Sequence, residues 1–291
     1  MAITLGNEFL TVQAVAQGAE LVCVRDKRDG VEHLWSADPA FWPRHAPVLF
    51  PIVGRLKNNQ YRIDGRSFCL GQHGFARDSV FELVQKDRQN VLFRLGWNEE
   101  TLRKYPYRFE LEIGYALQGA SLTTTYRVRN RDRQSLFFSI GAHPGLNCPF
   151  TADTNFEDYY LEFELPETAP VRPIDPNGLL KRERRPFLDN QRTIALTKEL
   201  FAGDALVFEK LRSQSVALKN RRNSKVIHFD FSGFPYLAFW SPPQGAPFIC
   251  IEPWFGHGDE EDFDGDFREK EGVMPLRPDE EFRCAYRISV D

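Results

Sequence analysis

The sequence predicts an all-β protein, built as a large antiparallel β-sandwich with a few short helices. Apolar and polar residues alternate with a period of two along much of the chain, which is typical of half-buried strands. Short turns such as QGAS (118–121) and NRDRQS (130–135) join consecutive strands, and strands joined so closely pair antiparallel. So many strands favour two sheets packed face to face over one open sheet.

The clearest strands are 109–117, 121–129, 159–165 and 281–290, where the alternation is almost unbroken. In the first of these, Phe109, Leu111 and Ile113 share one face. Less regular strands are expected at 8–16, 20–25, 79–86, 91–97, 204–209, 215–219, 225–231, 236–240 and 247–252.

Helical signals are few. Residues 98–105 carry Asn98 as a capping residue, acidic residues in the first turn and Pro106 just beyond the end, which predicts one short helix. Further helical turns are expected near 197–202 and 38–42. The polar stretch 166–193 is interpreted as an excursion between strands, because strand patterns of the same kind resume after it. We therefore expect a single domain over residues 1–291.

Composition excludes several classes of function. The chain has 291 residues and is 42% hydrophobic, with 25 Phe, 9 Tyr and 5 Trp, which is ample for a large core. Its 37 Lys and Arg are interspersed with 41 Asp and Glu, giving a net charge of −4 and no basic footprint for nucleic acid or an anionic membrane. The basic segment KRERRP (181–186) is expected to be a solvated loop.

The N-terminal segment lacks the pattern of a secretory signal, and no run of 18 apolar residues occurs, so a cytoplasmic protein with no membrane partner is expected. The five cysteines are scattered without metal-ligand spacing, which predicts reduced thiols and no metal or other cofactor. They are Cys23, Cys69, Cys148, Cys250 and Cys284.

Three segments place an ionisable residue in an apolar context rich in glycine and proline. They are QHGFARD with His73, FSIGAHPGLNCPF with His143, and FICIEPWFGHGD with Glu252. Each residue alone also fits a structural hydrogen bond or ion pair. Together, with no metal-ligand spacing among them, they favour general acid–base chemistry.

The segments HGFARD, IGAHPGL and CIEPWFGHGD, in this order, resemble the aldose 1-epimerase (galactose mutarotase-like) family, most closely its LacX-like branch. The segments GAELVCVRDKRDGVEHLW, PVLFPIVGRLKNNQY and LFAGDALVFEKL add to the resemblance, which runs from about residue 4 to residue 290. It implies a galactose mutarotase-like β-supersandwich, and an isomerase that interconverts the α and β anomers of an aldose.

The resemblance also implies roles for individual residues. Glu252 would be the general base that takes the proton of the C1 hydroxyl, and His143 the general acid that protonates the ring oxygen. His73 would hydrogen-bond the sugar near that oxygen, while Arg55 and Asp204 would hold hydroxyl groups. Anomer exchange needs one base and one acid on the same sugar, with no metal and no covalent intermediate, which agrees with the residue types found.

Other residues keep more than one interpretation. Phe75 and Trp254 could each offer a ring face on which a sugar stacks, whereas Trp240 is expected to pack in the core. Arg77 would clamp a phosphate if the substrate were a hexose 6-phosphate, or pair with Asp78 or a backbone carbonyl. A carbohydrate-binding protein without useful catalysis is a further alternative. Glycoside hydrolysis through Glu252 and Asp204 is disfavoured, because the histidines would have no task. The expected partner is a small sugar, and the chain is expected to be a monomer or homodimer.

Overall fold

A computed structural model describes residues 2–291. Its strands and helices follow one another along the chain with these bounds: β1 Ala2–Gly6, β2 Leu10–Val15, β3 Leu21–Asp26, β4 Val48–Leu49, η1 Lys57–Asn59, β5 Gln60–Ile63, β6 Arg66–Cys69, η2 Ala76–Asp78, β7 Glu82–Lys86, β8 Asn90–Gly96, α1 Glu99–Lys104, β9 Phe109–Gln118, β10 Ser121–Asn130, β11 Leu136–Phe138, β12 Ile140–Ala142, β13 Gly145–Asn147, η3 Phe156–Asp158, β14 Tyr159–Arg172, β15 Arg185–Ala195, η4 Lys198–Phe201, β16 Leu206–Glu209, β17 Ser215–Asn220, β18 Val226–Asp230, β19 Tyr236–Trp240, β20 Phe248–Phe255, η5 Phe267–Glu269, β21 Met274–Leu276 and β22 Glu281–Val290. The predicted all-β class with few short helices is confirmed.

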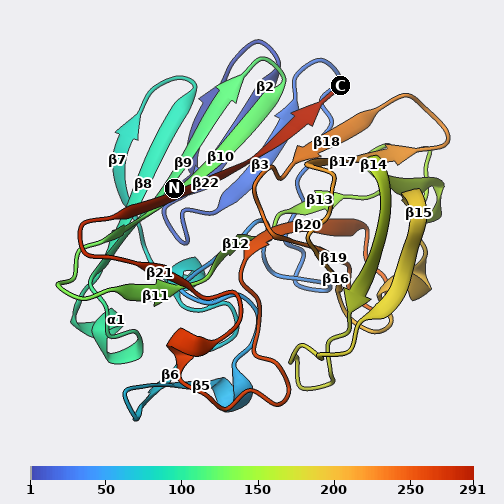
Figure 1. The fold of residues 1–291 in the computed structure, drawn as a ribbon. Coiled ribbons are helices and arrows are strands. Elements are labelled where there is room, and N and C mark those ends of the chain that lie inside the picture. The colour runs from blue at the N-terminus through green and yellow to red at the C-terminus, as the bar shows by residue number, and fades with distance from the viewer. Residues whose placement is uncertain (1) are drawn as a thin grey trace.

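Fifteen strands form one sheet, whose hydrogen-bonded order is β4-β12-β20-β19-β16-β14-β17-β18-β22-β10-β9-β8-β7, with β13 beside β20 and β15 beside β14. All of its paired strands are antiparallel, as predicted. Figure 1 shows β7 to β10 of this path on one side and β14 to β19 on the other, and the long β22 joins the two groups in the order of pairing. A sheet of this size bends on itself. The two layers of the sandwich are therefore parts of one continuous hydrogen-bonded sheet, where we expected two separate sheets.

The N-terminal strands β1, β2 and β3 form a smaller sheet against this large one. The Tyr115 hydroxyl of β9 donates to the carbonyl oxygen of Ala19 at 2.8 Å, and Gly6 N donates to the carbonyl oxygen of Arg88 at 2.9 Å. Leu10 and Val12 of β2 join the same buried cluster as Phe93 of β8. The two sheets thus share one apolar core.

Local signals predicted the one α-helix well. Asn98 Oδ1 accepts from Thr101 N at 2.9 Å, and the Thr101 hydroxyl accepts from Asn98 N at 2.8 Å. This reciprocal capping satisfies donors that the first helical turn leaves free. The predicted turn near 197–202 is also present as η4. The predicted turn at 38–42 is present too, as a single turn in which Phe41 N and Trp42 N both donate to Asp38 O at 3.0 Å.

The stretch 166–193 is corrected by the structure. Much of it belongs to β14 and β15, a long hairpin whose register shifts at three places. Most side chains of β15 are exposed, so the strand carries no apolar alternation by which it could be found. The KRERRP segment lies at its start, where exposed Arg182 pairs with Glu260 at 3.2 Å and Arg184 with Glu209 at 2.9 Å.

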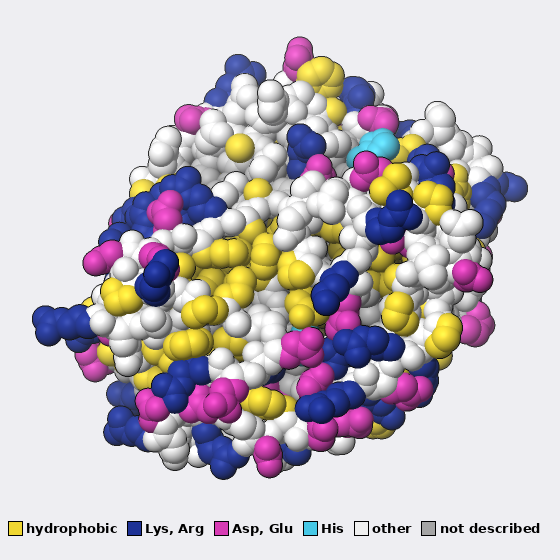
Figure 2. Space-filling model, viewed as in Figure 1, with side chains coloured by type: hydrophobic (Ala, Val, Ile, Leu, Met, Phe, Trp, Pro, Cys, Tyr) yellow, Lys and Arg dark blue, Asp and Glu magenta, His cyan; other side chains and the backbone are white. Residues whose placement is uncertain are grey.

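The surface carries charges of both signs. Figure 2 shows hydrophobic side chains gathered across the middle of one face, with acidic and basic side chains intermixed around them. Within residues 2–291, no helix has the length and apolar character needed to cross a membrane. The five cysteines are all free thiols.

Candidate active site

Strand β20 carries the buried acid. Glu252 lies between Cys250 and Trp254 on one face of the strand, because successive side chains of a strand alternate between faces. β19 pairs with one edge of β20, and the short strands β12 and β13 pair with the other. The backbone on which Glu252 stands is therefore held from both sides.

His143 lies at the break between β12 and β13. Gly141 of β12 pairs with Trp254, and Gly145 of β13 pairs with Cys250, so position 143 is level with Glu252 on the neighbouring strand. His143 Nε2 lies 3.2 Å from Glu252 Oε2. His143 is 8% exposed and Glu252 is 1% exposed. The structure thus brings together two residues that the sequence analysis assigned as acid and base.

Burial perturbs both groups in the direction of their neutral forms. It raises the pKa of the Glu252 carboxyl well above its usual range, and the negative charge of Asp204 adds to this shift. It lowers the pKa of His143 to about 3, and the positive charges of Arg77 and Arg44 act in the same direction. At 3.2 Å, Oε2 and Nε2 are close enough for a proton to pass directly from one group to the other.

His73 lies beside this pair in a strained backbone conformation. Its φ is +64°, a region that non-glycine residues seldom occupy and that the surrounding contacts must impose. His73 N donates to Gly54 O at 2.8 Å, and Gly54 N donates to His73 Nδ1 at 3.1 Å. Burial lowers the pKa of His73 well below its usual value. The imidazole is therefore neutral with its proton on Nε2, so that Nε2–H is a free donor.

Two glycines are required by close approach. A Cβ on Gly74, whose φ is +71°, would lie 2.3 Å from Phe50 O, so no other residue fits after His73. A Cβ on Gly141 would lie 2.6 Å from Trp254 Cδ1, so the indole lies directly over the strand next to Glu252. The first contact fixes the backbone next to His73, and the second fixes the position of the Trp254 indole next to Glu252.

Aromatic rings surround His143. The Trp42 indole stacks on the imidazole at 4.7 Å between centroids and 27° between planes. The rings of Trp240 and His73 meet it edge-on, each at 5.7 Å. Sequence reasoning missed Trp42, whose only signal is an aromatic residue in a polar, proline-containing loop.

Arg55 and Asp204 stand at the rim. Arg55 Nη1 donates to the carbonyl oxygen of Asn177 at 3.1 Å, and its positive charge lowers the pKa of His73. Asp204 is exposed on the turn after η4, has a φ of +78°, and lies close enough to Glu252 for its charge to raise the pKa of that carboxyl. The charges of both predicted hydroxyl-binding residues thus act on predicted catalytic residues, Arg55 on His73 and Asp204 on Glu252.

Arg77 and Phe75 face other neighbours. Arg77 Nη2 donates to the carbonyl oxygen of Gln72 at 2.7 Å, and its Nε lies 3.8 Å from Asp78 Oδ2. The Phe75 ring packs in the core, 5.8 Å from the ring of Phe109. These contacts match the structural interpretation of Arg77, and they give Phe75 a packing role where a sugar-stacking face was predicted.

One group of potential metal ligands lies in the part of the chain that the structure describes, and it coincides with this site. One donor atom from each of His143, Cys250 and Glu252 lies within 4.8 Å of the others. Burial raises the pKa of the Cys250 thiol well above its usual value, which disfavours the thiolate that a metal would need. His143 and Glu252 are already in contact with each other, so the set suits proton transfer better than coordination.

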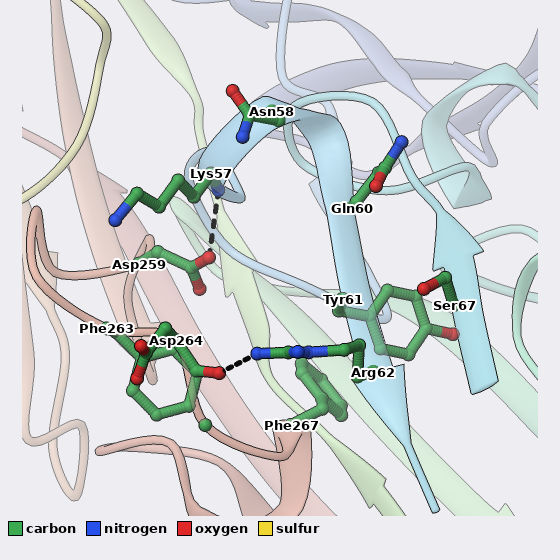
Figure 3. A pocket seen from close by; sticks show the side chains of 11 residues that line it. Lys57, Asn58, Gln60, Tyr61, Arg62, Ser67, Asp259, Phe263, Asp264 and Phe267 are labelled. Carbon is green, nitrogen blue, oxygen red and sulfur yellow. Dashed lines mark hydrogen bonds between the residues drawn. The ribbon is translucent and has the colours of Figure 1, made fainter. Parts of the chain in front are cut away.

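Other parts of the molecule carry cavities. One of about 370 Å³ lies between the β5–β6 hairpin and residues 259–267, and Figure 3 shows the side chains that line it. Two of its contacts lie within its own walls, since Lys57 N donates to Asp259 Oδ2 at 2.9 Å and Arg62 donates to the carbonyl oxygen of Asp264, whereas the buried Asp259 Oδ1 has no hydrogen-bond partner among residues 2–291. No predicted site residue lines this cavity.

Comparison with known proteins points in one direction. A sequence model described as aldose 1-epimerase matches residues 1–274. Two proteins of Lactococcus lactis subsp. lactis, named protein LacX, chromosomal, and protein LacX, plasmid, are each 39% identical and cover 100% of this chain and 99% of their own length.

Solved structures agree. A galactose mutarotase related enzyme from Lactobacillus acidophilus has a TM-score of 0.95 and 36% identity, with 100% of this chain and 97% of that chain covered. A galactose mutarotase-like protein from Lactobacillus casei has a TM-score of 0.94 and 32% identity, with both chains fully covered. A putative aldose 1-epimerase from Escherichia coli K12, at 17% identity and a TM-score of 0.78, shares the fold.

Proposed function

The chain belongs to the aldose 1-epimerase family, and on that basis we propose that it interconverts the α and β anomers of an aldose. The family membership confirms the resemblance seen in the three sequence segments. The observation that carries the proposal is the 3.2 Å contact between buried Glu252 and His143. An acid and a base so placed act on two oxygens bonded to the same sugar carbon.

The proposed reaction begins with the pair sharing one proton, which lies on His143 and leaves Glu252 as a carboxylate. Glu252 takes the proton of the C1 hydroxyl as the bond from C1 to the ring oxygen breaks. The electron pair of that bond goes to the ring oxygen, which takes the proton from His143 Nε2, and C1 becomes an aldehyde. Rotation about C1–C2 turns the other face of the carbonyl to the ring oxygen, and reversal of the same proton transfers gives the other anomer.

The electrostatics of the pair suit this sequence. Ring opening converts a carboxylate and an imidazolium into a carboxyl and a neutral imidazole, the forms that burial favours. Charging the pair costs free energy that ring opening then returns, so the contribution of the pair to the rate lies in positioning a base and an acid on the same sugar. In this proposal, His73 Nε2–H donates a hydrogen bond to the sugar near its ring oxygen. Arg55 and Asp204 bind the other hydroxyl groups, and the Trp254 indole packs against the sugar beside Glu252.

Exchange NMR on freshly dissolved α-glucose and α-galactose tests the proposal. The protein is expected to accelerate anomer exchange above the buffer rate, and Glu252→Gln to abolish the acceleration. Binding of sugar without faster exchange would instead support a carbohydrate-binding protein. A free aldose is favoured over a phosphorylated one, because Arg77 Nη2 already donates to the carbonyl oxygen of Gln72 at 2.7 Å.

A further inference from the structure

Trp42 lies in a loop that is tied down at several points. Trp42 N donates to Asp38 O at 3.0 Å, and Trp35 Nε1 donates to Trp42 O at 2.9 Å. At the end of the loop, the backbone N–H groups of His45 and Ala46 donate to Glu20 Oε1 at 2.8 and 3.0 Å. The loop has no regular secondary structure, yet its hydrogen bonds fix where the indole lies.

The indole belongs to a row of nearly parallel rings. Trp42 stacks on His143 at 4.7 Å and 27°, and on Phe248 at 5.6 Å and 18°. Phe248 stacks in turn on Trp35 at 4.5 Å and 24°. Phe248 is wholly buried, so the row leads from the core of the protein to the face of the imidazole.

His143 lacks the support that usually orients a functional histidine. Such a ring normally uses its second nitrogen to bond a carbonyl or carboxylate, which fixes its rotation. His143 Nδ1 is buried and has no hydrogen-bond partner in any other residue among residues 2–291. Glu252 restrains the ring at Nε2 alone, and one contact at the edge leaves the plane of the ring free to tilt. The plane is set by packing against Trp42.

We propose that Trp42 is a positioning residue for His143, holding the imidazole plane so that Nε2 stays directed at Glu252 and at the reacting sugar. The inference rests on the proposed anomer exchange, in which Trp42 touches no reacting atom. Gly145 supports the arrangement, because a Cβ there would lie 3.2 Å from Trp42 Cζ3 and 3.0 Å from Trp35 Cβ. The β13 backbone and the loop are thus packed too closely for Trp42 to settle elsewhere without rearrangement.

The test compares Trp42→Leu, Trp42→Phe and the wild-type chain in anomer exchange of glucose and galactose. Trp42→Leu is expected to lower kcat by about 10- to 100-fold with KM nearly unchanged, the scale of effect of a small misplacement of a catalytic group. Trp42→Phe retains a flat ring and is expected to recover most of the rate. Phe41→Leu, in the same loop but with an exposed side chain, is the matched control and is expected to keep wild-type kcat.

A second readout does not depend on turnover. In ¹⁵N-histidine-labelled protein, the His143 resonances, assigned with His143→Gln, are followed against pH in wild type and Trp42→Leu. Glu252, His73, Arg77 and Arg44 all act on His143 and are unchanged between the two proteins, so a difference reports the loss of the indole. Trp42→Leu is expected to raise the pKa of His143 as water reaches the ring.

The outcomes separate the two proposals. If the wild-type chain does not accelerate exchange, the proposed function fails, and the NMR comparison still tests the positioning role. If Glu252→Gln is inactive while a folded Trp42→Leu keeps both wild-type kcat and the wild-type His143 titration, anomer exchange stands and the role of Trp42 is overturned.

Discussion

Glu252 and His143 are cross-strand neighbours on one large sheet, with Glu252 Oε2 and His143 Nε2 separated by 3.2 Å. His143 lies between β12 and β13, level with Glu252, and its backbone is not part of the strand pairing with β20. The sheet holds the backbone of Glu252 rigidly, while the His143 side chain is left to direct Nε2 at Glu252.

Removal of either partner tests the pair. Glu252→Gln and His143→Ala are each expected to lower the exchange rate by about 10²- to 10⁴-fold, the usual contribution of a general acid or base. Exchange NMR with the buffer rate subtracted measures the loss, and thermal unfolding verifies that each variant is folded. Glu99→Gln, at the start of α1, is the surface control. Wild-type rates in both site variants would remove the mechanism.

The shared proton predicts an alkaline limit to the rate. The pair is active with one proton, so kcat is expected to be level through neutral pH and to fall where that proton is lost, at the raised pKa of Glu252. Asp204→Asn removes a negative charge that helps to raise this pKa. Its alkaline limb is therefore expected at lower pH than in wild type. A limb that stays in place, measured at saturating sugar, would show that Asp204 does not act on Glu252.

Arg77 distinguishes free from phosphorylated sugars. Because its guanidinium bonds Gln72 O and faces Asp78, Arg77→Ala is expected to destabilise the fold by about 1 to 2 kcal/mol. The ratio of kcat/KM for galactose to that for galactose 6-phosphate is expected to stay the same. Urea unfolding and exchange NMR on both sugars provide the measurements. A selective loss on the phosphate would revive the sugar-phosphate alternative.

Gly141 is expected to tolerate no side chain. The Cβ of Gly141→Ala would lie 2.6 Å from Trp254 Cδ1, and such overpacking costs about 1 to 3 kcal/mol. Gly114→Ala in β9 is the matched control, since the nearest atom to its Cβ is 3.6 Å away. Urea unfolding compares the two, and equal stabilities would show that the indole moves aside freely.

Metal removal is expected to leave the reaction unchanged. Glu252 and His143 already contact each other at 3.2 Å, and burial raises the pKa of the Cys250 thiol, which favours the protonated thiol. Exhaustive dialysis against a chelator should therefore preserve the exchange rate, and Cys250→Ser should preserve it too. Loss of rate on dialysis, restored by zinc in wild type but not in Cys250→Ser, would make the cluster of His143, Cys250 and Glu252 a metal site.

Features that depend on neighbouring residues in the chain were predictable. Asn98 and Pro106 bound the helix α1 by local chemistry, and the alternation in β9 and β10 follows from one buried face. The exposed strand β15 lacks such a pattern, because pairing with β14 and not burial holds it in place. Sequence therefore located the longer strands that line the core. It missed the exposed β15, and it missed the buried β4, β12 and β13, which are too short to show an alternation.

The site divides in the same way. His73, His143 and Glu252 stood out because a polar residue in an apolar segment is visible in the sequence. The proton position on His73 depends on Gly54 N, and the orientation of His143 depends on Trp42, which are contacts between distant segments. The partner of Arg77 could not be predicted either, because the sequence offers several acceptors and the fold brings Gln72 O to its guanidinium.

The double pairing of β20 has a consequence for altering sugar preference. The reacting pair stands on a strand and a strand end, whereas Arg55 and Asp204, the groups proposed to read the sugar hydroxyls, project from loops. Loops can be exchanged between relatives without moving a hydrogen-bonded strand. If the proposed roles hold, a change of sugar preference is thus expected to need only the exchange of the two loops that carry Arg55 and Asp204, with Glu252 and His143 left in place.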